Sequence, residues 1–128
     1  MLEGSCDCGA VRYTVNGTLS EVTDCNCGIC RRTGGLWAYY SPRVVTMTGP
    51  THIYMRGDRM LEIHRCKNCG CVMFWTPVDK AYERMGVNAR MLPPGSLETV
   101  PIVKCDGASW QTGTLAPSDR FGAKRTYS

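Results

Sequence analysis

The sequence contains no apolar run that approaches the roughly 18 to 20 residues of a membrane-spanning helix. Its first residues, MLEGSCDCGAVRY, have neither the basic segment nor the apolar core of a signal peptide. The first absence excludes a helical membrane protein, and the second argues against export. We therefore expect a soluble, cytoplasmic protein without a membrane partner.

Long blocks of like charge are missing as well. The chain has 15 Lys and Arg and 11 Asp and Glu residues, a formal charge of +4, but nowhere do five like charges follow one another. The closest basic pairs are Arg31 with Arg32 and Lys124 with Arg125. A chromatin-binding protein would need a long basic extension or a continuous basic face, so the sequence argues against a nucleic-acid partner.

Helical periodicity is scarce, whereas short alternating stretches are common. Val11, Tyr13 and Val15 would share one face of a strand. Further strands are predicted over 44–48, 72–76, 82–88 and 98–105, with a hairpin over 52–65 that turns at 56–59 and one helical turn over 28–33. We expect a mainly β fold of short antiparallel sheets.

The length of 128 residues fits a single domain, and 43% hydrophobic residues are enough for a packed core. We assign residues 1–110 to this domain. Residues 111–128 have little periodicity, and we expect them to form a C-terminal tail that is partly mobile.

Cysteine is the residue type that stands out, with nine copies. Seven of them form three tight clusters: Cys6 and Cys8; Cys25, Cys27 and Cys30; Cys66 and Cys69. Neighbours this close are poorly placed to form disulfides with each other, and the missing export signal also favours reduced thiols. Clustered thiolates with Cys-x-x-Cys spacing favour a metal, and zinc before an iron–sulfur cluster.

The number of ligands predicts one closed and one open zinc site, two zinc ions per chain. Two complete four-thiolate sites would need eight cysteines, but the clusters supply two, three and two. The best fit is a closed site of Cys6, Cys8, Cys66 and Cys69 and an open site of Cys25, Cys27 and Cys30. Spacing alone leaves the pairing of Cys6 and Cys8 with the triple open. Three protein ligands and a free position are usual for catalytic zinc.

The three motifs occur in a familiar order: GSCDCGAV at 4–11, CNCGICRR at 25–32 and CKNCG at 66–70. With them, the chain resembles the family of glutathione-dependent formaldehyde-activating enzymes, which also includes centromere protein V. The resemblance covers most of the chain, with weaker signals in GVNA at 86–89, LPP at 92–94 and Ser109-Trp110.

The resemblance implies a β-tent zinc fold that is pinned by a structural zinc. This zinc would lie on Cys6, Cys8, Cys66 and Cys69, and a second, labile zinc would lie on Cys25, Cys27 and Cys30. It also implies a carbon–sulfur lyase acting on a glutathione-type adduct, the reverse of glutathione addition to formaldehyde.

Physical chemistry supports a thiol substrate at the open site. The substrate sulfur can become the fourth ligand of zinc and is then deprotonated near neutral pH. Four thiolates and one Zn²⁺ give a formal charge of −2, so nearby cations would help. Arg31 and Arg32 directly follow Cys30 and are our candidates for substrate binding, with a solvated arginine pair as the alternative.

The sequence departs from the family at Arg65, where an aromatic residue is common, and at Cys71, where a small or hydroxyl residue is usual. Cys71 fits a buried small residue, an exposed thiol or an alternative ligand, and we expect Cys105 in the core. His52 and His64 fit strand residues better than ligands. The aromatic residues shortly after the triple either wall a pocket or pack in the core: Trp37, Tyr39 and Tyr40.

Two other functions stay open beside the enzyme. The chain could be a non-catalytic zinc-binding module for protein or nucleic-acid partners. It could also be a redox or zinc-buffering protein that uses the open triple.

Overall fold

The computed structural model describes residues 1–55, 57 and 59–110. The expected C-terminal tail and two residues of the expected hairpin turn lie outside the described residues. The strands are β1 (Leu2–Ser5), β2 (Arg12–Val15), β3 (Val22–Cys25), β4 (Trp37–Tyr40), β5 (Val45–Thr48), β6 (Thr51–Tyr54), β7 (Leu61–Cys66), β8 (Val72–Pro77), β9 (Met85–Asn88) and β10 (Ile102–Cys105). The helices are α1 (Gly28–Thr33) and the 3-10 turns η1 (Pro42–Val44), η2 (Ala89–Met91) and η3 (Gly107–Trp110). The mainly β architecture is confirmed.

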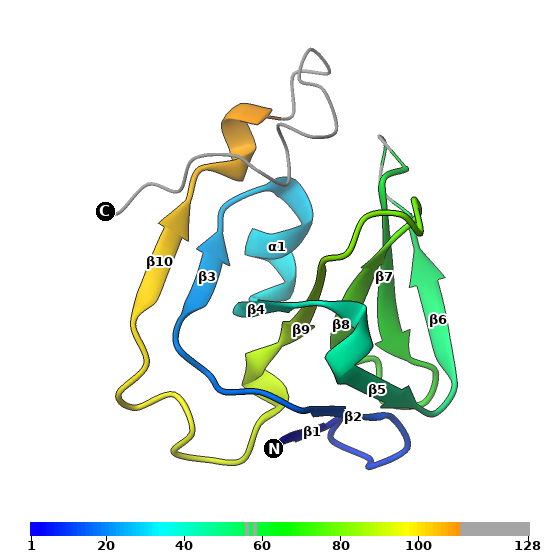
Figure 1. Ribbon diagram of the computed structural model, residues 1–128. Coiled ribbons are helices and arrows are strands. Elements are labelled where there is room, and N and C mark those ends of the chain that lie inside the picture. The colour runs from blue at the N-terminus through cyan, green and yellow to red at the C-terminus, as the bar shows by residue number, and fades with distance from the viewer. Residues whose placement is uncertain (56, 58, 111–128) are drawn as a thin grey trace.

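The strands form two sheets (Figure 1). The small sheet has the order β1-β2-β5, and the large sheet has the order β10-β3-β4-β9-β8-β7-β6. In Figure 1 the large sheet extends from β10 at the left to β6 at the right, with the small sheet below it. The paired strands are antiparallel except for β10 and β3, which are parallel in the register Cys105 to Cys25.

Each face of the large sheet carries a packed layer. On one face lie Tyr13 and Val15 of the small sheet and Val11 just before β2, which are fully buried with Met85 and other apolar residues, as their alternation predicts. On the other face, Trp37, Ile63 and Trp75 form a cluster that Ile29 and Cys30 of α1 cover. The sheet therefore holds α1 and its cysteines against a rigid surface.

Asn88, at the end of β9, joins three segments of the chain. Its side chain accepts a hydrogen bond from the Leu36 N–H (3.2 Å) and donates one to the Val72 carbonyl (2.8 Å). Its own carbonyl accepts a hydrogen bond from the Tyr13 hydroxyl (2.8 Å). Asn88 is buried, so water does not replace these partners easily.

Replacing Asn88 by alanine should destabilise the fold by about 2 to 4 kcal/mol, because the buried Leu36 N–H and Val72 carbonyl lose their partner. Denaturant unfolding measures this change. Asn16→Ala, at an exposed asparagine, is the matched control and should change the free energy of unfolding by less than about 0.5 kcal/mol. Equal effects of the two substitutions would contradict the assigned role.

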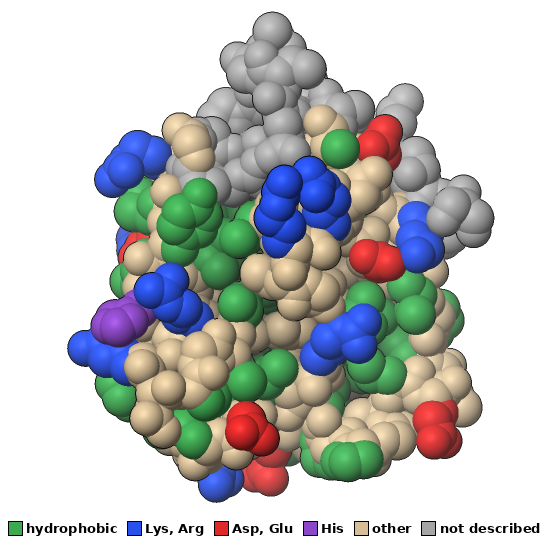
Figure 2. Space-filling model, turned by 180° about the vertical axis from the view of Figure 1, so that it is seen from behind, with side chains coloured by type: hydrophobic (Ala, Val, Ile, Leu, Met, Phe, Trp, Pro, Cys, Tyr) green, Lys and Arg blue, Asp and Glu red, His purple; other side chains and the backbone are tan. Residues whose placement is uncertain are grey.

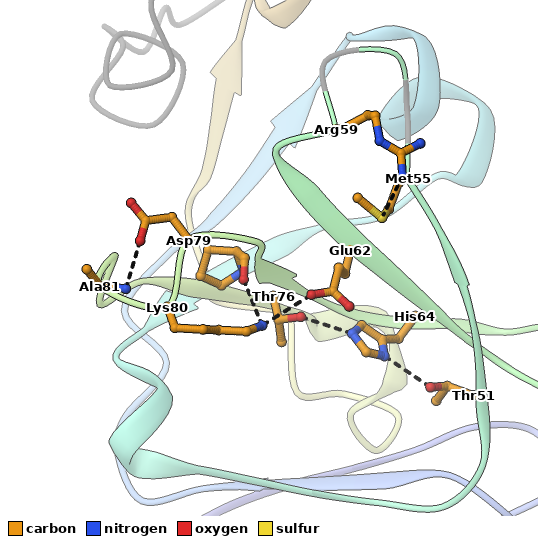
Figure 3. A network of polar contacts seen from close by, with 10 residues as sticks. Thr51, Met55, Arg59, Glu62, His64, Thr76, Asp79, Lys80 and Ala81 are labelled. Atoms are coloured by element: carbon orange, nitrogen blue, oxygen red, sulfur yellow. Dashed lines mark hydrogen bonds and ion pairs between the residues drawn. The ribbon is translucent and has the colours of Figure 1, made fainter.

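His64 links three strands of the large sheet (Figure 3). One ring nitrogen lies 3.0 Å from the Thr51 hydroxyl on β6 and the other 3.0 Å from the Thr76 hydroxyl on β8. Burial lowers its pKa. His52 is exposed on β6, and neither histidine belongs to a cysteine cluster. Among the described residues, both histidines are therefore strand residues, as expected.

Candidate metal centres

Four cysteines meet where the two sheets join. Cys6 and Cys8 lie in the turn between β1 and β2, and Cys66 and Cys69 lie at the turn between β7 and β8. Their sulfur atoms all lie within 4.8 Å of one another, with 3.6 Å from Cys8 to both Cys6 and Cys66. We call these residues the four-cysteine cluster. The structure thus groups Cys6 and Cys8 with this pair and not with the triple.

The donor set of the four-cysteine cluster fits a tetrahedral zinc ion. Zinc–sulfur bonds of about 2.3 Å place the sulfur atoms of a tetrahedron about 3.8 Å apart, close to the distances found here. Backbone N–H groups point at the sulfurs, as in the contact of 3.3 Å from Val11 to Cys6. The N–H groups of Cys71 and Cys8 lower the pKa of the Cys69 thiol to about 6. The backbone thus favours the thiolate, which is the form that binds a metal.

A second group of cysteines surrounds the start of α1. Cys25 ends β3, Cys27 is the N-cap of α1, and Cys30 lies inside the helix. Their three sulfur atoms lie within 4.8 Å of one another, and we call them the three-cysteine cluster. Local chain geometry holds them, because the N–H of Cys30 contacts the sulfur of Cys27 (3.5 Å) and the N–H of Cys27 that of Cys25 (3.4 Å).

The three sulfur atoms of the three-cysteine cluster, once deprotonated, would favour a bound cation. Hydrogen bonds with Cys25 and Cys27, together with burial, strongly raise the pKa of the Cys30 thiol. Three thiolates at this spacing would repel one another, and a positive charge between them would offset that repulsion. Soft thiolate donors suit zinc, so both clusters could hold a metal ion of this kind.

One side of the three-cysteine cluster is covered by the end of β10. Cys105 is buried against Cys25 and Cys27, but it is not one of the three sulfurs that lie together. Gly107 packs so closely that a Cβ there would lie 2.4 Å from the Cys25 sulfur. Asn26 fixes this segment by accepting a hydrogen bond from the Ala108 N–H (2.9 Å). Cys105 is therefore buried as expected, but it borders the cluster as well as the core.

The two arginines proposed for the substrate lie in the last turn of α1 and are exposed. The Arg32 guanidinium donates a hydrogen bond to the Gly28 carbonyl (2.9 Å), so that side chain folds back along its own helix. Neither Arg31 nor Arg32 lines the two cavities described next.

The larger of these cavities opens between β3 and β4. The two strands pair only through Thr23 and Trp37, whereas β4 pairs with β9 along its whole length. Where β3 and β4 separate lies a cavity of about 400 Å³, which we call the strand-gap cavity. Its lining residues are Thr18, Ser20, Glu21, Thr23, Trp37, Ala38, Tyr39, Tyr40, Ser41, Glu83 and Arg84. The three aromatic residues singled out in the sequence all wall this cavity.

A smaller cavity of about 320 Å³ lies between α1 and the edge of the large sheet, on β6 to β8. Arg65 is one of its walls. Ile29 and Val72 provide apolar walls. This cavity is therefore mainly apolar with one cation.

Comparison with known proteins identifies the family. The family model described as glutathione-dependent formaldehyde-activating enzyme matches residues 1–112. The chain belongs to this family. It is also similar to the crystal structure of a Rhodobacter sphaeroides protein, with 27% sequence identity and a TM-score of 0.65 over 79% of this chain and 99% of that one.

In this member of the glutathione-dependent formaldehyde-activating enzymes, two residues of the strand-gap cavity were not predicted from the sequence. Thr23 and Arg84 line the strand-gap cavity. Thr23 and Cys25 alternate along one strand, which was a weak signal in the sequence for Thr23. Nothing in the sequence indicated Arg84.

Among the described residues, no helix has the length and hydropathy that a membrane crossing requires.

Proposed function

We propose that this protein is a zinc-dependent carbon–sulfur lyase that acts on S-hydroxymethylglutathione or a closely related thiol adduct. The observation that carries the proposal is the contrast between a cluster of four sulfurs and a cluster of three. A four-cysteine zinc site is closed, whereas a three-cysteine site leaves one position for a substrate. The family match supports the glutathione adduct as substrate.

The reaction breaks the carbon–sulfur bond of the adduct. The hydroxyl group loses its proton and becomes the carbonyl of formaldehyde, while the sulfur keeps the bonding electrons and leaves as the thiolate or, with that proton, as the thiol. A zinc ion at the three-cysteine cluster would supply a ligand position for the leaving sulfur and stabilise it as thiolate.

The chain's own residues would act around that position. Cys25, Cys27 and Cys30 would hold the metal, and α1 packs through Ile29 and Cys30 on the large sheet. Arg31 and Arg32 add two exposed positive charges beside Cys30. Their charge would offset the surplus negative charge of the thiolates and attract an anionic substrate.

A non-catalytic module for nucleic acid is the main alternative. It would need a continuous basic surface. On the face shown in Figure 2, Lys and Arg side chains lie singly or in small groups among acidic and uncharged ones. This distribution favours a small-molecule substrate.

Native mass spectrometry of protein purified without chelator tests the proposal. We expect two zinc ions per chain, of which one becomes capped by glutathione or is lost at millimolar glutathione, while the other stays. The expectation follows from one open and one closed ligand set. A single zinc ion that ignores glutathione would contradict the lyase and favour the structural module.

A further inference from the structure

Two buried polar groups have no hydrogen-bond partner among the described residues: the Thr23 hydroxyl and the Trp37 indole N–H. The exposed fractions of these residues are 1% and 3%. Each unsatisfied buried group lowers stability, and native folds seldom keep such groups without a reason. Two of them on paired residues of neighbouring strands suggest that a ligand completes their bonding.

Both residues line the strand-gap cavity. Thr23 and Trp37 face each other as the single pair between β3 and β4, and both line the cavity where the strands separate. A volume of about 400 Å³ lies in the range of small-molecule sites. The lining carries charges of both signs, Glu21, Glu83 and Arg84, which suits a zwitterionic ligand, although Glu83 is also paired with Arg43.

The cavity lies beside the three-cysteine cluster. Side chains alternate along a strand, so Thr23 and Cys25 project from the same face of β3, about 7 Å apart along the chain. Tyr39 lies between the two sites, because it lines the cavity and its pKa is raised first by burial and further by the charges of Cys25 and Cys30. Its phenol lies near the Thr23 side chain, which lowers the same pKa.

We propose that the strand-gap cavity binds the thiol adduct and that Thr23 and Trp37 hold its hydroxyl group. This inference rests on the proposed lyase function. An indole N–H can only donate, whereas a threonine hydroxyl can also accept. The adduct hydroxyl therefore accepts from Trp37 and donates to Thr23. This hydroxyl is two bonds from the sulfur, so an adduct whose sulfur is held at the three-cysteine cluster would carry its hydroxyl toward the Thr23–Trp37 pair.

Thr23→Val separates a binding role from a structural one. Valine has nearly the same shape but lacks the hydroxyl, so removing an unpaired buried group should leave the melting temperature unchanged or raise it. Binding of the adduct, formed from formaldehyde and glutathione at equilibrium, should weaken about tenfold in calorimetric titration of the zinc-loaded protein. S-methylglutathione, which lacks the hydroxyl, should bind both proteins equally.

Thr14→Val, at a half-buried threonine of β2 in the small sheet, is the matched control and should leave adduct binding unchanged. The indole N–H resonance of Trp37, assigned with Trp37→Phe, should shift with the adduct and much less with S-methylglutathione. If Trp37→Phe does not fold, the other two tryptophans are replaced one at a time to assign the resonance.

The outcomes distinguish the cavity assignment from the proposed lyase function. Full adduct affinity in Thr23→Val, or an unmoved Trp37 resonance in protein that binds and cleaves the adduct, overturns the cavity assignment and leaves the lyase intact. Failure of wild-type protein to bind either glutathione compound overturns both. Weaker adduct binding with a lowered melting temperature would indicate a structural role and also counts against the assignment.

Discussion

Replacing Cys66 by serine is expected to abolish the folded state. Cys66 belongs to the four-cysteine cluster, which brings the β1–β2 turn and the β7–β8 turn together, so a zinc ion bound there would link the two turns. Structural zinc contributes on the order of 10 to 16 kcal/mol of apparent folding free energy, as much as the whole net stability of a typical domain. Loss of one ligand should therefore leave a chain without dispersed amide resonances or a cooperative thermal transition.

Cys71→Ser is the matched control for this experiment. Cys71 is half-buried and lies two residues after Cys69, but it is outside the four-cysteine cluster. We expect this variant to fold, to keep its zinc and to lose no more than about 1 kcal/mol. A strong chelator should unfold the wild-type protein in the same way as the Cys66 substitution. A Cys66→Ser protein that melts like wild type would refute the structural role of the cluster.

The cysteine groups could be predicted because ligand spacing is a local property. A turn such as Cys66-x-x-Cys69 places two sulfurs together whatever the rest of the fold does, and counting then leaves few combinations. Cys6 and Cys8 lie together with this pair, the combination that counting favoured. The short helix over 28–33 was predictable for the same reason, since it directly follows the metal turn and ends at Gly34, whose φ is +71°.

Three strands escaped prediction: β1, β3 and β4. β1 and β3 contain Gly, Ser or Asp, which are poor strand formers, and the aromatic residues of β4 were interpreted as a pocket wall or core and not as a strand. Their partners come from distant parts of the chain. The parallel pair of β10 and β3, which brings Cys105 beside Cys25, therefore had no local signal.

The strand-gap cavity was beyond prediction for a related reason. It exists because β3 and β4 pair at one position and then separate, which is a property of the whole sheet. The sequence marked Trp37, Tyr39 and Tyr40 as either pocket or core. The structure gives Trp37 both roles, since it is 3% exposed and also lines the cavity.

Replacing Cys30 by serine should remove activity while keeping the fold. Cys30 is half-buried on α1, and the four-cysteine cluster that links the sheets is untouched. The variant should hold one zinc ion in place of two and keep its melting temperature within a few degrees. Lyase activity should fall more than 100-fold, because loss of even an outer-shell partner of a catalytic metal costs about 10- to 100-fold. Native mass spectrometry and an adduct-cleavage assay measure the two effects.

Cys105→Ser decides whether the second site is open. Cys105 is buried beside Cys25 but lies outside the three-cysteine cluster, so this variant should keep both zinc ions and activity within a few-fold of wild type. Loss of the second zinc in Cys105→Ser would mean that Cys105 completes a closed four-thiolate site. A closed site leaves no position for a substrate sulfur, and the lyase would then give way to a structural or zinc-buffering role. Full activity in Cys30→Ser would also contradict the proposed lyase mechanism, because the reaction would then not need the three-cysteine cluster.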